Sequence, residues 1–145
     1  MFQELLRRLT APEPEQLPEI DSRLALGALL VRIARTDGDY AAVEIAQIDQ
    51  ALMARYGLSK DEAAALRAEC EALEAEAPDT VRFTRAIKDT VSYENRFSVI
   101  EALWSVVMAD GVRDDEEDSM MRMTASLLGI SDQDSHRARL KVSAR

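Results

Sequence analysis

The sequence is poor in cysteine, glycine and proline, and these shortages limit the kinds of protein that it can encode. A single cysteine, Cys70, has no partner for a disulfide within the chain, which fits a reducing compartment. Five glycines and four prolines in 145 residues indicate helices rather than strands and turns. No apolar run reaches the roughly 20 residues of a membrane span, and charged residues interrupt any signal-peptide core at the N-terminus. We therefore expect a cytoplasmic, all-α protein.

Positive charge is also scarce. The chain has 18 Lys and Arg against 27 Asp and Glu, so its net charge is −9. Nucleic acid requires a basic face, and we therefore expect no nucleic-acid partner. An acidic balance suits a cation or a basic protein surface, and it is also a common route to solubility.

Apolar residues recur at helical spacing in segments that Gly, Pro or capping residues separate. Residues 1–20 contain a short helical pattern and then three prolines, which predicts a short helix followed by a stiff connector. The remaining pattern predicts helices over residues 22–36, 42–56, 59–76, 80–91, 94–108, 115–128 and 131–140.

Capping residues indicate where some of these helices begin, and polar residues indicate which faces are exposed. Asp21 or Ser22 would cap the first of them, and Ser59 with Glu62 has the spacing of a capping box for the third. The third helix carries four glutamates that we expect on a solvated surface: Glu69, Glu71, Glu74 and Glu76.

The helices form two copies of one unit. Adding 73 to a residue number maps equivalent positions onto each other: Leu30 onto Leu103, Asp37 onto Asp110, Glu44 onto Glu117 and Ile48 onto Met121. After the second helix of each unit the offset falls to 72, so Ser59 maps onto Ser131. We expect one domain over residues 21–145, a bundle of about seven helices. In it, two three-helix repeats, about 22–76 and 94–141, pack about a pseudo-twofold axis.

An Asp-Gly turn with a glutamate seven residues after the Asp occurs at the same place in both units. The residues are Asp37, Gly38 and Glu44 in the first, and Asp110, Gly111 and Glu117 in the second. Calcium and magnesium take carboxylate and carbonyl oxygens as ligands, so a turn Asp and a helix Glu could converge on one cation. Weaker candidate ligands lie nearby: Asp39, Asp114 and Asp115. The spacing is not that of an EF-hand.

Helix capping explains much of the same pattern without a metal. Asp114 and Glu117 have the spacing of a capping box, and acidic residues complement the positive end of a helix dipole. In the first unit Ala41 stands at the N-cap position and has no side chain that can cap, yet Glu44 is retained. Capping alone therefore accounts less well for Glu44, which favours a second role.

The sequence resembles the TerB family of tellurite-resistance proteins over residues 24–140. The resemblance rests on Ala34-Arg35-Thr36-Asp37-Gly38 with Glu44, and on Val107-Met108-Ala109-Asp110-Gly111 with Glu117, which are similar to the paired A-x-x-D-G…E motifs of that family. The second copy departs from the motif at Val107, and the first departs at Ala41, where the family often has a small polar residue.

The resemblance implies a cytosolic helical domain with an internal repeat and an acidic surface that binds metal ions. By position, the metal ligands would be Asp37, Glu44, Asp110 and Glu117. The family is associated with resistance to tellurite and other stresses, and with partners at the cytoplasmic face of membrane proteins.

Two residues with reactive side chains have ordinary interpretations. Cys70 falls on the apolar face of its helix and is expected in the core, and His136 is expected on the surface. We therefore expect a non-enzymatic binding protein whose ligand is calcium or magnesium. Two alternatives stay open: a structural adaptor whose acidic turns only cap helices, and a metal-dependent hydrolase that uses the clustered carboxylates.

Overall fold

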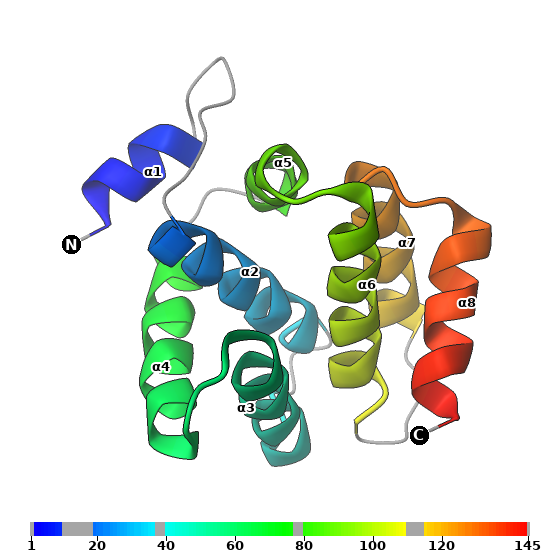
Figure 1. Ribbon diagram of the computed structural model, residues 1–145, viewed down its shortest axis with the longest axis horizontal. Coiled ribbons are helices and arrows are strands. Elements are labelled where there is room, and N and C mark those ends of the chain that lie inside the picture. Colours follow the sequence, from blue (N-terminus) through cyan, green and yellow to red (C-terminus); the bar gives the residue numbers. More distant parts are fainter. Residues whose placement is uncertain (1, 10–18, 37–39, 77–79, 110–114, 145) are drawn as a thin grey trace.

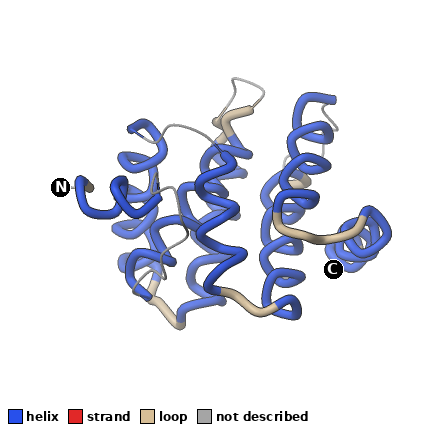
Figure 2. The backbone as a smooth tube through the Cα atoms, turned by 90° about the horizontal axis from the view of Figure 1, so that it is seen from above, coloured by secondary structure: helices blue, strands red, loops and turns tan. Residues whose placement is uncertain are grey.

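The computed structural model describes residues 2–9, 19–36, 40–76, 80–109 and 115–144, and over these residues it consists of helices and short loops (Figures 1 and 2). The eight helices among them are α1 (Gln3–Leu9), α2 (Glu19–Ala34), α3 (Ala42–Tyr56), α4 (Lys60–Glu76), α5 (Thr80–Thr90), α6 (Tyr93–Val107), α7 (Asp115–Leu127) and α8 (Asp132–Ser143). The all-α prediction is confirmed. Within the described part of the chain, no helix is both long and apolar enough to cross a bilayer.

Helices α2 and α6 form the centre of the bundle. Residues 24–31 of α2 are all buried, and so are residues 103–107 of α6. A helix that is apolar on all sides must be covered on all sides. Accordingly α2 contacts α3, α4, α5, α6 and α7, and α6 contacts α2, α3, α5, α7 and α8.

Equivalent helices of the two repeats make equivalent contacts. In the first unit (α2, α3 and α4), α2 packs on α3 and α4, and in the second unit (α6, α7 and α8), α6 packs on α7 and α8. The units meet where α2 contacts α6, α3 contacts α6 and α2 contacts α7. These contacts are the ones expected if two copies of one unit pack together. They do not test the rotation that relates the copies, so the pseudo-twofold axis stays a prediction.

The start of α2 differs from the prediction. The helix begins at Glu19, so Asp21 and Ser22 lie inside its first turn and do not cap it. Acidic residues in a first turn complement the helix dipole, which allows the helix to extend past both predicted caps. Asp21 instead accepts a hydrogen bond from Arg8 Nη1 at 3.2 Å.

Helix α1 belongs to the packed structure. Phe2, directly before α1, and Leu5 of α1 are buried in the core, and α1 contacts α5. The predicted boundary between residues 1–20 and the helical domain is therefore crossed by side-chain packing, although the division into two segments stays a prediction.

The predicted ends of α3 and α7 are confirmed to within one residue. Gly57 and Gly129 have φ values of 65° and 75°, the left-handed conformation that ends a helix after α3 and α7. At the start of α4, Ser59 N donates to Glu62 Oε1 at 2.9 Å and Glu62 N donates to Ser59 Oγ at 3.2 Å. Both halves of the predicted capping box are therefore present.

Candidate functional site

Most residues of the predicted cation site lie outside the described part of the chain. These are Asp37, Gly38 and Asp39 before α3, and Asp110, Gly111 and Asp114 before α7. Asp115 and Glu117 have a described backbone in the first turn of α7, but their side chains are also outside. Glu44 is thus the predicted ligand whose side chain the structure describes.

Glu44 lies in the first turn of α3 and is completely buried. Its Oε1 accepts a hydrogen bond from the backbone N–H of Ala41 at 3.3 Å. Ala41 has the extended conformation of an N-cap residue, with φ −70° and ψ 151°, but makes no side-chain cap. One of the two hydrogen bonds of a capping box is therefore present, from the N-cap N–H to Glu44, while the other, which needs an N-cap side chain, cannot form. This explains why Glu44 can serve the helix beside an alanine, which the sequence pattern alone did not reveal.

Tyr40 and Arg35 lie on either side of the first Asp-Gly turn in sequence. The Arg35 guanidinium carbon is 4.9 Å from the centroid of the Tyr40 ring, a cation–π contact. Burial of the Tyr40 hydroxyl, followed by its proximity to the Glu71 carboxylate, raises the pKa of Tyr40 well above its ordinary value of 10.0. Tyr40 therefore stays a neutral phenol at physiological pH.

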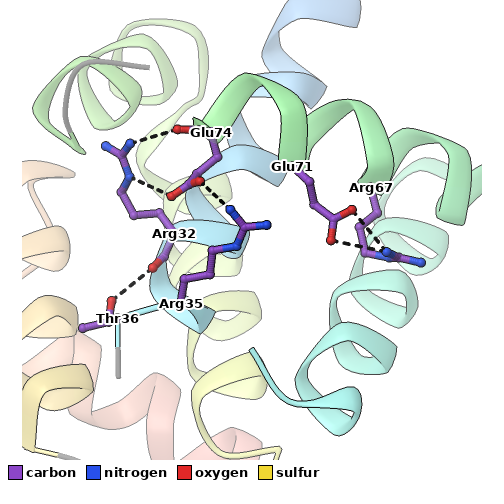
Figure 3. Close-up of polar contacts among 6 residues, drawn as sticks. All are labelled: Arg32, Arg35, Thr36, Arg67, Glu71 and Glu74. Carbon is purple, nitrogen blue, oxygen red and sulfur yellow. Dashed lines mark hydrogen bonds and ion pairs between the residues drawn. The ribbon is translucent and has the colours of Figure 1, made fainter. Parts of the chain in front are cut away.

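An ion-pair cluster joins α4 to the C-terminal end of α2 (Figure 3). Arg35 Nη1 lies 3.0 Å from Glu74 Oε2, and Arg32 Nε lies 3.5 Å from Glu74 Oε1. Arg32 Nη2 also donates to the backbone carbonyl of Glu74 at 3.3 Å. Because two arginines converge on one carboxylate that is only 13% exposed, Glu74 ties the end of α2 to α4.

A second cluster joins α3 to α4. Arg67 Nε donates to Asp49 Oδ1 at 2.7 Å, and Arg67 Nη1 lies 3.4 Å from Glu71 Oε2. The hydrogen bond to Asp49 raises the pKa of Arg67 further above its usual value. The prediction of a solvated surface is therefore wrong for Glu71 and Glu74. Arg32 and Arg35 cover Glu74, and Arg67, one turn earlier in α4, pairs with Glu71.

Among the described side chains, no three His, Cys, Asp or Glu residues gather closely enough to hold a metal ion. The predicted cation site depends on residues 37–39 and 110–117, so it stays a prediction. The hydrolase alternative depends on the same carboxylates and stays a prediction as well.

Cys70 is buried in the core, as expected. Burial raises the pKa of its thiol to about 12, so the reactive thiolate is disfavoured. His136 is exposed, which confirms the other expectation.

The second unit contains a pocket that the sequence analysis did not predict. It has a volume of about 390 Å³ and is lined from α6, α7 and α8 by Trp104, Asp118, Arg122, Asp132, Ser135, His136 and Arg139. Trp104 Nε1 donates to the buried Ser135 Oγ at 3.1 Å, and the Arg139 guanidinium lies 5.8 Å from the Trp104 ring. The repeat carries a sequence signal for this pocket. At the equivalent positions of the first unit, Trp104 is replaced by Val31, and the two arginines by the ion pair of Asp49 with Arg67.

A groove of similar volume, about 390 Å³, lies between α3 and α6, where the two units meet. Its lining includes Gln47 and Ala51 of α3 and Glu101, Ala102 and Ser105 of α6. Lys141 Nζ lies 3.3 Å from Glu101 Oε1 and pairs with this carboxylate, which belongs to a side chain that is only 11% exposed.

Comparisons with known proteins agree with this architecture. A family model described as "Tellurite resistance protein TerB" matches residues 23–140. The crystal structure of a protein of unknown function from Porphyromonas gingivalis W83 is similar, with a TM-score of 0.65 and 17% sequence identity. The similarity covers 92% of this chain and 96% of that one, and at this identity it shows the fold alone. A search of curated proteins found no significant match.

Proposed function

The chain belongs to the TerB family, and from this we propose that it is a non-enzymatic cytoplasmic protein that binds a divalent cation through its two Asp-Gly turns. The oxygen ligands are Asp37, Glu44, Asp110 and Glu117, and the cation is calcium or magnesium, which prefer such ligands. The description of the family as tellurite resistance proteins extends the proposal to a role in tellurite or related stress resistance.

The complete burial of Glu44 is the observation that best supports the proposal. Removing a carboxylate from water costs several kcal/mol unless hydrogen bonds or positive charge compensate for it. One oxygen of Glu44 accepts the backbone N–H of Ala41, which follows Asp37 by four residues in the sequence. A cation bound at this end of α3 would add positive charge that favours an ionised carboxylate there.

The proposed mechanism is ordering of the turns by the ion. Each turn connects a central helix, α2 or α6, to the next helix of its unit. A cation held by a turn Asp and a helix Glu fixes this connection, and the fixed turns then present a surface to a protein partner at the cytoplasmic face of a membrane protein.

Calorimetric titration tests the cation site. Calcium, magnesium, manganese and zinc are titrated into chelator-treated protein, and we expect saturable binding of at least one ion that weakens at least tenfold in Asp110→Asn. Glu69→Gln is the matched control, because Glu69 is an exposed carboxylate of α4. Absence of binding at millimolar ion, or equal binding by Asp110→Asn, would leave these carboxylates with a capping role only.

A second candidate function, a protein adaptor, is favoured by the groove between α3 and α6. Helix α5 packs on α2 and α7, with the Arg32 guanidinium 5.2 Å from the Phe83 ring. The offset of 73 places Ser105, a residue of the groove, at the position of Arg32. The groove is therefore the second unit's counterpart of the surface that α5 covers.

The occupant that we propose for this groove is an amphipathic helix of a partner protein, with basic residues on its flanks. Helix α5 has this character, because Phe83 and Ile87 are buried while Lys88 is exposed. A basic helix would also complement the net charge of −9.

Capture of partners from a membrane extract distinguishes the two functions. An adaptor retains a basic partner in the presence of chelator, and Ala102→Arg, which fills the groove, abolishes the retention. Ala75→Arg on the exposed side of α4 is the control. Retention that chelator abolishes and Ala102→Arg leaves intact would instead support the cation-dependent function.

A further inference from the structure

The two units differ sharply at one pair of equivalent positions. In the first unit, Arg67 of α4 donates to Asp49 of α3 at 2.7 Å. The offsets of 73 and 72 place Arg122 at the position of Asp49 and Arg139 at the position of Arg67. The second unit therefore has two arginines where the first has an arginine and its carboxylate partner.

Both arginines line the pocket of about 390 Å³ between α6, α7 and α8. The other differences between the units also make this place more polar. Trp104, Ser135 and His136 line the pocket, where the first unit has the aliphatic residues Val31, Ala63 and Ala64. Of these, Val31 and Ala63 are fully buried. In the first unit, buried aliphatic side chains and an ion pair therefore occupy the equivalent position, whereas the second unit has a pocket there.

The polar groups of the pocket suit an oxyanion. Arginine guanidinium groups present paired N–H donors that match the geometry of a carboxylate or a phosphate. Ser135 Oγ accepts the Trp104 Nε1–H at 3.1 Å and can donate its own O–H hydrogen to a ligand oxygen. The His136 ring, whose Nδ1 is 3.5 Å from Arg139, adds a further nitrogen at the rim.

Two carboxylates also line the pocket and restrict the ligand. Asp118 lies one helical turn before Arg122, and Asp132 is the first residue of α8. With two arginines and two aspartates, the lining has no large excess of positive charge, so it disfavours nucleic acid and other polyanions. A volume of this size suits a small molecule.

We propose that this pocket binds a small molecule through a carboxylate or phosphate group, which lies between Arg122 and Arg139 in the position that the Asp49 carboxylate holds beside Arg67. The pocket uses none of the residues of the proposed cation site, so the two proposals stand independently.

Tryptophan fluorescence of the full chain tests the proposal, because Trp104 is the only tryptophan and lines the pocket. Inorganic phosphate and succinate are titrated separately at constant ionic strength, with chloride as the reference. We expect a saturable change with at least one of them, and the better of the two identifies the anionic group. A response that is equal for chloride, or that never saturates, would overturn the proposal.

Arg122→Asp is the decisive variant, since it recreates the ion pair of the first unit. It should weaken anion binding at least tenfold, while the thermal unfolding midpoint stays the same or rises. The Arg122→Gln variant should also bind the anion more weakly. Because it removes the guanidinium group without adding a carboxylate, it separates the two effects of Arg122→Asp. Arg137→Gln is the control, because Arg137 is an exposed arginine of α8 outside the pocket. Wild-type binding by both Arg122 variants would contradict the proposed site.

Discussion

At the scale of single residues, the contact between Gly27 and Cys70 decides how closely α2 approaches α4. A Cβ atom at Gly27 would overlap with Cys70 Sγ and lie 3.1 Å from Cys70 Cβ. Cys70 is fully buried, so its side chain has no open space to enter. The glycine is therefore required by packing and not by a special backbone conformation.

Gly27→Ala should destabilise the chain by about 1–3 kcal/mol, the usual cost of overpacking a core. Urea denaturation followed by circular dichroism measures the change. In the double variant Gly27→Ala/Cys70→Ala much of the loss should be recovered, because the overlapping sulfur is gone. A single variant as stable as the wild type would show that α2 and α4 can separate without cost.

The thiol of Cys70 also makes stability depend on pH. Burial raises the pKa of this thiol from an ordinary value of 9.0 to about 12, so above pH 9 the folded chain keeps a proton that the unfolded chain loses. The stabilisation is thus complete below pH 9 and is lost as the pH rises toward 12, by up to about 1.4 kcal/mol per pH unit. In Cys70→Ala the fall in unfolding free energy over this window should be shallower. The half-buried Tyr40 and Tyr56, whose pKa values are also raised, contribute almost equally to both proteins, so an identical slope would contradict the assignment.

At the scale of the helix, α3 and α4 differ in how their N-termini are capped: α4 has a complete capping box, and α3 has one of its two hydrogen bonds. Ser59 and Glu62 exchange both hydrogen bonds at the start of α4, whereas at α3 only the bond from Ala41 N to Glu44 is present. Ala41 nevertheless has an N-cap conformation. The backbone of α3 is therefore ready for a capping side chain that the sequence does not supply.

Ala41→Ser should complete this box, with the new hydroxyl accepting the N–H of Glu44. We expect a gain of about 0.5–1 kcal/mol, at the low end of measured N-cap effects, read as a higher midpoint in thermal unfolding. Ser59→Ala at the start of α4 should cost a similar amount and serves as the reciprocal control. Destabilisation by Ala41→Ser would mean that the turn before α3 needs an alanine for a reason other than capping.

At the scale of the whole molecule, one apolar core joins both units to α1 and α5. Phe2 and Leu5 belong to the same buried cluster as the central helices, and Arg8 holds α1 to the start of α2 through Asp21. The N-terminal helix therefore contributes to the stability of the bundle rather than to a separate site.

Leu5→Ala tests this contribution. Leu5 is 5% exposed, and its truncation should cost about 2–3 kcal/mol because it removes buried apolar surface and leaves a cavity. Cation and anion binding should be unchanged at temperatures where the variant is folded, since Leu5 lies in neither site. Unaltered stability would indicate that α1 separates from α5 in solution.

Much of the fold was predictable because the signals are local. Helices α3 and α7 end within one residue of their predicted ends, and Ser59 with Glu62 caps α4 as their spacing indicated. The prediction failed at Asp21, where a good capping residue lies inside a helix that begins two residues earlier. Of the predicted cation site, Glu44 alone has a described side chain, and its burial could not be inferred from its place near a helix start.

The sequence by itself determined the helices, their buried faces and the family, because periodicity, caps and the repeated Asp-Gly motif depend on residues close together in the chain. Only the tertiary structure decided which charges meet. Arg32 contacts Glu74 42 residues away, and Arg122 and Arg139 line one pocket from different helices. Such encounters depend on how helices pack across the bundle, and neither propensity nor spacing along one helix carries that information.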